Sequence, residues 1–462
     1  VNHCESRRGS RGKRALKKSE KEFTMASSSS TSTLFRRLLS LQQRPRLFSS
    51  RPLLASETSS AGGGGGGDGG NDSTTTTTNV LLIHGLLGSG RNWRSVARAL
   101  AAGASARAAE ILNAPRSAPL PRVSVTAVDL RCHGGTNATM GDLFGPPHGI
   151  SEAAADVNDF ATATFGSDGS FSSSFSSSFS SSSTPFSCSS APPPAAPDVL
   201  IGHSLGGKVA LEAARQSLVS AASLPKQLWV LDSPLSARRH EESGPASRRA
   251  TQRPPRAPGA TAGVLSVVRS VPSSVLTSRR EAERWLLENN RGMTQAVAAW
   301  LCSNLVQGSE EKAENKIEIE KKIDKKPEIE RKSGGDERSK GLVWQFDPEG
   351  AAALFESYQL LDAWPLLRCP PVGLGINVVV GGRSDRWSAA ERRRLQEAEA
   401  ASSSTAAPVG AESESQRGSL KVHLLPKAGH WVHVDDQEGL LALLVPAVAE
   451  VAAAKALKAA KS

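Results

Sequence analysis

Short apolar runs separated by helical segments make up most of the sequence between residues 79 and 456. The runs are rich in Val, Leu and Ile and lack the polar–apolar alternation of a strand with one exposed face. Strands of this kind are buried on both faces of a sheet, and their alternation with helices indicates that they run parallel. The sequence therefore predicts an α/β fold with an open, mostly parallel sheet covered by helices on both faces. The runs are NVLLIHG, RVSVTAVDL, DVLIGHS, QLWVLDSP, INVVVGG and KVHLLPKAGH.

Stretches poor in large apolar residues interrupt this pattern and cannot contribute to a core. We expect them to be disordered insertions on the surface of a single domain that spans 79–456. A Gly/Thr-rich linker is expected in front of that domain, over residues 56–78. The predicted insertions are 167–197, 240–262, 307–340 and 399–419.

The N-terminal 55 residues differ in composition from everything that follows. Residues 1–24 precede the first Met and are interpreted as an upstream or non-native segment. Residues 25–55 are rich in Arg, Ser and Leu and contain no acidic residue, which is typical of an organellar transit peptide. The sequence RPRLFSS resembles a mitochondrial processing site. We therefore predict import into mitochondria, with the chloroplast as the alternative, and removal of the leader near Phe48.

Charge and cysteine usage exclude several classes of function. The net charge is +11, but most of the excess lies in the first 55 residues, so no nucleic-acid partner is predicted. The five cysteines form no CxxC pair, which indicates neither a metal site nor a disulfide framework. No GK[ST] follows the glycine run, so no nucleotide cofactor is expected. An apolar run of about 18 residues is absent, so no transmembrane segment is predicted and the protein should be soluble.

The sequence Gly202-His203-Ser204-Leu205-Gly206 lies between a predicted buried strand and a predicted amphipathic helix. G-x-S-x-G in this position forms a sharp turn that holds the serine at positive φ and exposes its hydroxyl above the sheet. The glycines remove Cβ atoms that would collide, and the helix N-terminus places partial positive charge near developing negative charge. Ser204 is therefore the candidate nucleophile. An ordinary strand–helix turn with an incidental serine is the alternative.

A serine hydroxyl is a weak nucleophile at neutral pH and needs a base to take its proton. Three histidines near the C-terminus are candidates. His430 follows a glycine at the end of a predicted strand, where a loop can carry the imidazole over the sheet edge. His423 lies within the strand and suits a packed or surface position better. His433, at a helix start, suits a position that supports the site from behind, or a surface position. We predict that His430 is the base. The histidine follows the serine along the chain, which is the order found in folds that contain this turn.

The segment HGLLGS follows the first predicted strand of the domain. Its glycines allow a tight turn in which the Leu86 amide can point toward the nucleophile beside the Leu205 amide. Two such amides form an oxyanion hole, and a tight turn without catalytic duty is the alternative. Asp129 and His133, after the next strand, are expected to shape the neighbouring loop.

Several motifs resemble those of the α/β-hydrolase superfamily, in particular the abhydrolase domain-containing protein eleven group of mitochondrial hydrolases and similar small bacterial esterases. The resemblance spans roughly residues 79 to 456. It implies an α/β-hydrolase fold with a helical lid at about 236–360, a triad of Ser204, His430 and Asp232, and small carboxylic esters as substrates. The chain departs from the group where Gly and Thr runs replace the usual N-terminal β-hairpin and where insertions interrupt the lid. The motifs are HGLLGS, DLRCHG, GHSLGGKVAL, VLDSP followed by RRH, and AGHWVH.

Two residues compete for the acid of the triad. Asp232 is favoured by the resemblance, whereas Asp385, after the strand INVVV, occupies the common position for this fold. Either carboxylate would orient the base as the serine loses its proton. We predict a serine hydrolase that cleaves carboxylic esters or thioesters through an acyl-serine intermediate, with no metal or cofactor. An acyltransferase and a non-catalytic ligand-binding or scaffold protein are the alternatives, and the sequence names no protein partner.

Overall fold

Seven strands form one sheet in the computed structural model, which describes residues 53–61, 76–115, 120–166, 195–237, 261–290, 292–308, 341–403 and 418–461. The strand order is β1-β3-β2-β4-β5-β8-β9, and every neighbouring pair is parallel except β1 and β3. The chain order reverses around β2, and ligands bind at the carboxyl ends of strands beside such a reversal. The strands are β1 (Leu54–Ala61), β2 (Thr77–Ile83), β3 (Arg122–Asp129), β4 (Val199–His203), β5 (Gln227–Leu231), β8 (Gly375–Gly381) and β9 (Ser419–Leu425).

Strand β1 differs from the sequence-based expectation. It pairs antiparallel with β3, from Leu54 opposite Asp129 to Ala61 opposite Val123. The predicted linker over 56–78 therefore contains the end of β1 at residues 56–61 and the start of β2 at residues 77–78, so the prediction is wrong for these residues. The strand has few large apolar side chains because it lies at the edge of the sheet, where it pairs backbone groups of β3 that would otherwise be left without partners.

Several predicted segments lie outside the described residues. These are the upstream segment 1–24, the transit peptide except for residues 53–55, part of the linker, and most of each predicted insertion. Regular elements reach a few residues into three of the predicted insertions. At these margins α6 begins at Thr261, β6 ends at Gln307, α12 ends at Ser403 and β9 begins at Ser419.

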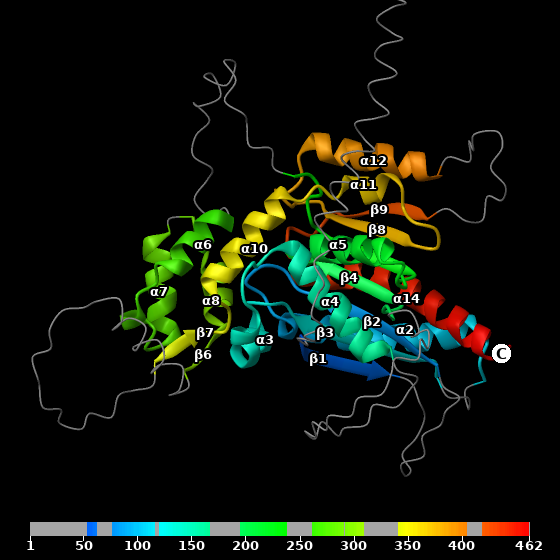
Figure 1. Ribbon diagram of the computed structural model, residues 1–462, viewed down its shortest axis with the longest axis horizontal. Helices are drawn as coiled ribbons and strands as arrows, with labels where there is room; N and C mark the ends of the chain where they lie inside the picture. The colour runs from blue at the N-terminus through cyan, green and yellow to red at the C-terminus, as the bar shows by residue number, and fades with distance from the viewer. Residues whose placement is uncertain are drawn as a thin grey trace, which may run out of the picture. The chain divides into compact units, whose positions relative to one another are not determined.

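Helices cover both faces of the sheet, as predicted (Figure 1). On one face α4, α5 and α12 pack against the strands in one buried cluster, and on the other face α2 and α14 form a second. Leu81 and Ile83 of β2 belong to the first cluster, whereas Val80 and Leu82 belong to the second. Burial on both faces explains why this strand is a continuous apolar run. The helices are α2 (Arg94–Ile111), α4 (Ile150–Phe165), α5 (Leu205–Val219), α12 (Ala389–Ser403) and α14 (Gln437–Ala459).

Helix α14 is the one helix in the described part of the chain that is long and apolar enough, by length and composition, to cross a membrane. Its side chains at Leu440, Leu444 and Val448 are completely buried in the second cluster. Gly103 of α2 permits a close approach, because a Cβ there would lie 3.1 Å from Val445 Cγ2. Packing against the sheet and α2 therefore explains the apolar composition of α14.

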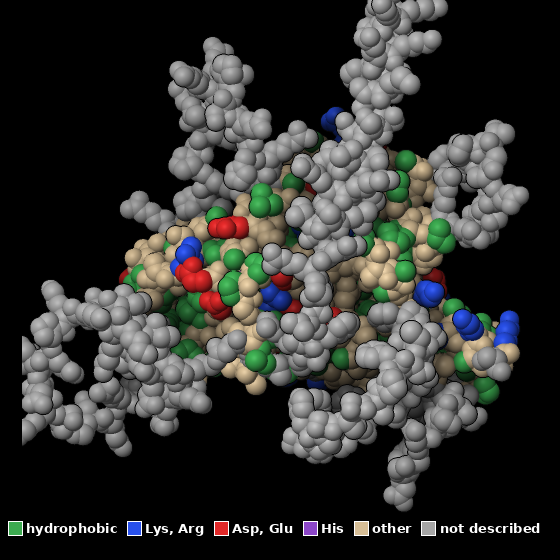
Figure 2. All heavy atoms as spheres, in the orientation of Figure 1, with side chains coloured by type: hydrophobic (Ala, Val, Ile, Leu, Met, Phe, Trp, Pro, Cys, Tyr) green, Lys and Arg blue, Asp and Glu red, His purple; other side chains and the backbone are tan. Residues whose placement is uncertain are grey.

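The segment between β5 and β8 forms a lid with a buried cluster of its own, gathered at one end of the sheet (Figure 1). Leu87 from the core joins this cluster. Arg269 of α6 and Glu349 of α10 form a two-bond ion pair on the lid surface. Figure 2 shows acidic and basic side chains side by side over this part of the face in view. The lid elements are α6 (Thr261–Arg269), α7 (Arg279–Asn289), α8 (Gln295–Cys302), the antiparallel pair β6 (Leu305–Gln307) and β7 (Leu342–Trp344), and α10 (Pro348–Leu360). Helix α11 (Trp364–Arg368) follows the lid and packs in the first cluster of the core.

Candidate active site

Ser204 occupies a sharp turn between β4 and α5. Its backbone has φ 52° and ψ −118°, a conformation that residues other than glycine rarely adopt. Gly206 makes the turn possible, because a Cβ there would lie 2.5 Å from the His84 carbonyl oxygen. At Gly202, a Cβ would lie 2.1 Å from the Gly206 carbonyl oxygen. The G-x-S-x-G sequence thus produces the strained turn expected from it, at the carboxyl end of β4.

The carboxylate of Asp232 is completely buried at the carboxyl end of β5, the strand next to β4. It accepts four hydrogen bonds, the full capacity of an ionised carboxylate. Three donors come from the end of β8 and the segment that follows it, and the fourth is His430. These donors offset the loss of water that burial of a charge entails. They are the Gly381 amide (2.9 Å), Ser384 Oγ (2.6 Å), Trp387 Nε1 (2.7 Å) and His430 Nδ1 (2.8 Å).

His430 lies in the loop between β9 and α13 (Val432–Asp435), with its side chain 21% exposed. Donation from Nδ1 to Asp232 leaves Nε2 as the nitrogen that can accept a proton. The His430 carbonyl accepts a hydrogen bond from His203 Nε2 at 2.8 Å. His203 immediately precedes Ser204, so this hydrogen bond connects the His430 backbone to the strained turn. Among the described residues, no hydrogen bond joins Ser204 Oγ to His430. The bond from His203 to the His430 carbonyl is what relates the two residues.

Asp385 is placed differently from Asp232. Its side chain is 89% exposed, and its carboxylate pairs with the neighbouring arginine at 3.4 Å. The structure therefore brings Asp232, and not Asp385, against His430. The segment around Asp385 still contributes to this arrangement, because Ser384 and Trp387 donate to Asp232.

The other two C-terminal histidines pack against tryptophans. His423 stacks on Trp229 with ring centroids 5.2 Å apart. His433 stacks on Trp93 at 4.1 Å, and burial lowers the pKa of His433 to about 4. His423 is therefore in a packed position, one of the two expected for it. His433 lies with its ring centroid 5.2 Å from that of His203, the residue before Ser204, which fits the expected supporting position.

The loop after β2 passes directly beside Ser204. A Cβ on Gly85 would lie 3.2 Å from Ser204 Cβ, so glycine permits this close approach. The next residue, Leu86, is one of the predicted oxyanion donors. The other, Leu205, is the first residue of α5, and an amide in that position has no acceptor within the helix. Both predicted donors therefore belong to backbone that adjoins Ser204.

Two buried histidines hold this loop to the end of β3. Nε2 of His133 accepts the Leu87 amide at 3.0 Å, and Nε2 of His84 accepts the Leu130 amide at 3.1 Å. Each ring donates its Nδ1 proton to a backbone carbonyl, so both imidazoles are neutral. Burial lowers the pKa of His84 to about 4 and that of His133 to about 3. His133 thus occupies the loop-shaping position expected for it.

Asp129, the last residue of β3, joins the same two loops. Its carboxylate accepts the Gly90 amide at 2.7 Å and the Gly135 amide at 2.7 Å. A Cβ on Gly134 would lie 2.2 Å from the Asp129 carboxylate. The carboxylate therefore connects the loop after β2 to the start of α3 (Gly134–Met140).

Lys208 of α5 links the helix that follows Ser204 to other segments, a role that sequence reasoning missed. Its side chain is buried, and Nζ donates to the carbonyls of Ser236 (3.1 Å), Tyr358 (2.9 Å) and Leu361 (2.7 Å). The amine therefore ties α5 to the segment that enters the lid and to the end of α10. The signal in the sequence was a lysine directly after GHSLGG, at the start of a helix with a buried face.

A cluster suited to a metal ion includes none of the residues described above for the Ser204 site. Among the described residues, the one such group is Cys132, His148 and Asp347, whose ligand atoms all lie within 4.8 Å of one another. Cys132 follows β3 by a few residues, and Asp347 begins α10. The Ser204 site itself is composed of a serine, an imidazole, a carboxylate and backbone amides, which together can carry out acyl transfer without a cofactor.

Comparison with known proteins gives the family. The model of the Alpha/beta hydrolase family matches residues 80–443. Among solved structures, the chain is similar to a marine microorganism esterase (15% identity, TM-score 0.43, 80% of this chain and 95% of that chain). It is also similar to the peroxisomal α/β-hydrolase Lpx1 of Saccharomyces cerevisiae (14% identity, TM-score 0.43, 86% and 89%) and to the thioesterase domain from the curacin biosynthetic pathway (15% identity, TM-score 0.39, 81% and 92%).

No match was found among curated proteins. The family model extends from β2 into α14, so it includes the strained turn and all three candidate triad residues. The narrower abhydrolase group indicated by the motifs stays a prediction. From the extent of the match, this chain belongs to the alpha/beta hydrolase family.

Proposed function

We propose that this protein is a serine hydrolase that cleaves carboxylic esters or thioesters, with Ser204 as nucleophile, His430 as base and Asp232 as acid. The observation that carries the proposal is the 2.8 Å hydrogen bond from His430 Nδ1 to the buried Asp232 carboxylate. Further support comes from the positive φ of Ser204 and from the chain order serine, aspartate, histidine, which is the order used in this family's fold.

In the first half of the reaction, His430 Nε2 takes the proton of Ser204 as Oγ attacks the substrate carbonyl carbon. The Asp232 carboxylate stabilises the imidazolium that forms. The amides of Leu86 and Leu205 stabilise the oxyanion, and each such donor contributes about 3 kcal/mol to the transition state. The intermediate then collapses, His430 gives its proton to the departing alcohol or thiol, and the acyl group stays on Ser204.

In the second half of the reaction, water is the nucleophile and the same groups act again. His430 takes a proton from the water molecule as the water oxygen attacks the acyl carbonyl carbon. The carboxylic acid leaves, and Ser204 recovers its proton from His430. An alcohol or thiol acceptor in place of water would make the protein an acyltransferase, so the choice between the two depends on which acceptor reaches the acyl-serine.

The test is labelling with a fluorophosphonate probe, followed by hydrolysis assays on esters and thioesters of increasing acyl length. We expect the wild type to be labelled and Ser204→Ala to be unlabelled. Product release with water as sole acceptor supports a hydrolase. Undiminished labelling of a folded Ser204→Ala variant contradicts the proposal. Stabilisation by a ligand without any product would favour the ligand-binding alternative.

We also propose that the protein acts in mitochondria. The support is the acid-free, Arg-rich and Ser-rich composition of residues 25–55. N-terminal sequencing of the mature protein should find a start near Phe48. A start at Met25, or a fusion of residues 25–60 that stays in the cytosol, contradicts this proposal. Delivery of the same fusion to chloroplasts would favour the alternative destination.

A further inference from the structure

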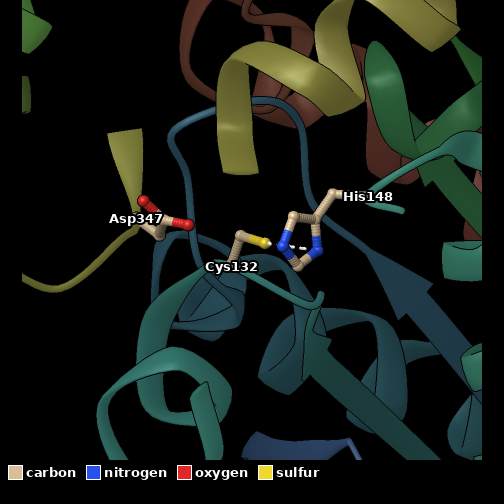
Figure 3. Close-up of side chains that lie close together, drawn as sticks. All are labelled: Cys132, His148 and Asp347. Carbon is tan, nitrogen blue, oxygen red and sulfur yellow. Dashed lines mark hydrogen bonds between the residues drawn. The ribbon is translucent and has the colours of Figure 1, made fainter. Parts of the chain in front are cut away.

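Cys132, His148 and Asp347 come together at the junction between the core and the lid. Cys132 lies in the loop after β3, His148 in the loop before α4, and Asp347 at the start of α10. Cys132 Sγ is 3.3 Å from His148 Nδ1, and all three ligand atoms lie within 4.8 Å of one another. Figure 3 shows the thiol between the carboxylate and the imidazole. Three chain segments therefore bring one sulfur, one nitrogen and one oxygen ligand to a common point.

We propose that these three side chains form a binding site for Zn²⁺, with a fourth position open to water. Thiolate, imidazole and carboxylate are the ligands that zinc uses in proteins, whereas Ca²⁺ and Mg²⁺ take oxygen ligands. With zinc bonds of about 2.0 to 2.3 Å, tetrahedral ligand atoms lie roughly 3 to 4 Å apart. The 3.3 Å separation of the sulfur and nitrogen already falls within this range. The inference does not depend on the proposed hydrolase activity.

Hydrogen bonds already fix the backbone and the carboxylate at this point. The Asp347 amide donates to the Cys132 carbonyl at 2.9 Å. The two Asp347 carboxylate oxygens accept the amides of Glu349 and Gly350, both at 3.0 Å. Each oxygen keeps a lone pair for a metal, and such outer hydrogen bonds orient ligating carboxylates. A Cβ on Gly350 would lie 2.3 Å from Cys132 Sγ, so glycine allows the thiol to lie against α10.

A cysteine nucleophile with a histidine and an acid is the competing interpretation of the same residues. In such a triad the histidine stands between the thiol and the acid, but here the thiol stands between the other two (Figure 3). Cys132 is also only 3% exposed, so a substrate has little access to its sulfur. A bound Zn²⁺ would replace the thiol proton, which is released to solvent.

An ion at this position would join the lid to the core beside the oxyanion loop. Cys132 immediately precedes His133, whose ring accepts the Leu87 amide. Asp347 begins α10, and carbonyls at the end of that helix hold Lys208. Occupancy should therefore restrain the lid and stabilise the folded chain.

The test titrates the full chain, first stripped of metal, with Zn²⁺ in competition with a chromophoric chelator. We expect the wild type to bind one equivalent that Cys132→Ser, His148→Gln and Asp347→Asn bind more weakly. The affinity should fall by more than about 100-fold, because changes to outer residues alone cost about 10- to 100-fold. Cys369→Ser, which removes an exposed free cysteine, is the matched control and should bind like the wild type.

Co²⁺ in place of Zn²⁺ adds a readout that reports sulfur ligation directly. The wild type and Cys369→Ser should show a thiolate-to-cobalt charge-transfer band, which Cys132→Ser should lack. Zn²⁺ should raise the Tm of these two proteins and of no ligand variant, with folding established by circular dichroism. Unchanged Zn²⁺ affinity in a folded Cys132→Ser variant, or a wild-type Co²⁺ complex without the sulfur band, overturns the site. Fluorophosphonate labelling of the same samples tests the hydrolase proposal separately.

Discussion

His430 donates its Nδ1 proton to the carboxylate of Asp232, a side chain with no exposure to solvent. The same carboxylate accepts hydrogen bonds from Ser384 and Trp387, which follow β8. The orientation of the His430 ring is therefore determined by two strand ends together, because Asp232 follows β5 and the segment after β8 holds its carboxylate.

Asp232→Asn should lower kcat on a small ester by about 10³ to 10⁴, the scale seen when a triad aspartate is neutralised. Asp385→Asn is the matched control. Because the Asp385 side chain is 89% exposed and its carboxylate pairs with Arg386, this substitution should cost roughly tenfold or less. Steady-state kinetics on both variants, with folding checked by circular dichroism, measures the difference. A larger loss at Asp385 would move the acid to that residue.

Trp387→Phe should lower kcat by about 10- to 100-fold with little change in KM. The variant keeps an aromatic ring but removes the Nε1 donor that lies 2.7 Å from Asp232. Hydrogen bonds to charged groups contribute about 1.5–3 kcal/mol, and each 1.36 kcal/mol corresponds to about tenfold in rate. Trp344→Phe, in the lid, is the control for loss of an indole. A rise in KM at unchanged kcat would instead assign Trp387 to substrate binding.

The neutral histidines behind the oxyanion loop predict a loss of stability in mild acid. Folding lowers the pKa of His84 from 6.5 to about 4 and that of His133 from 6.5 to about 3. Between the folded and unfolded pKa values, the unfolded chain takes up protons that the folded chain excludes. The free energy of unfolding is therefore not reduced by these histidines above pH 6.5. It falls as the pH is lowered toward 4 for His84 and 3 for His133, by up to about 1.4 kcal/mol per pH unit for each residue.

Urea unfolding at a series of pH values measures this decline. His84→Gln and His133→Gln retain an acceptor for the loop amides but cannot titrate in this range. Each variant should therefore lose stability less steeply with falling pH than the wild type. Slopes equal to that of the wild type in both variants would show that other groups cause the decline.

Lys208→Met should destabilise the fold by about 2–3 kcal/mol, because it leaves three partly buried carbonyls without their charged donor. Methionine retains most of the buried stem. Lys421→Met, at an exposed position in β9, is the matched control and should change the free energy of unfolding by less than about 0.5 kcal/mol. Equal effects of the two substitutions on urea midpoints would contradict a linking role for Lys208.

The strands, the strained turn and the position of His430 could be predicted because their signals are local. The run DVLIGHS followed by an amphipathic segment specifies a strand, a turn and a helix within a short stretch, and the turn at Ser204 has the expected positive φ. The choice between Asp232 and Asp385 could not be made from residue patterns, since both follow buried strands. It depends on which carboxylate the sheet places against His430.

Other features depended on contacts between distant segments. Residues 54–61 have weak strand character in isolation and become a strand because β3 offers an unpaired edge. The cluster of Cys132, His148 and Asp347 has no spacing signal, because its ligands come from three separate parts of the chain. Cys132 has no cysteine neighbour at metal-ligand spacing, so the sequence pattern does not indicate this cluster.

The lid has an apolar cluster distinct from the two that hold the sheet together. Residues such as Leu286 and Leu301 are completely buried there, without contributing to the packing beneath Ser204. Substitutions in separate clusters have nearly independent effects on stability. Over evolutionary time, substitutions can consequently accumulate in the lid without disturbing the packing that positions Ser204, His430 and Asp232. Related chains could then diverge in their lids while inheriting the same arrangement of these three residues.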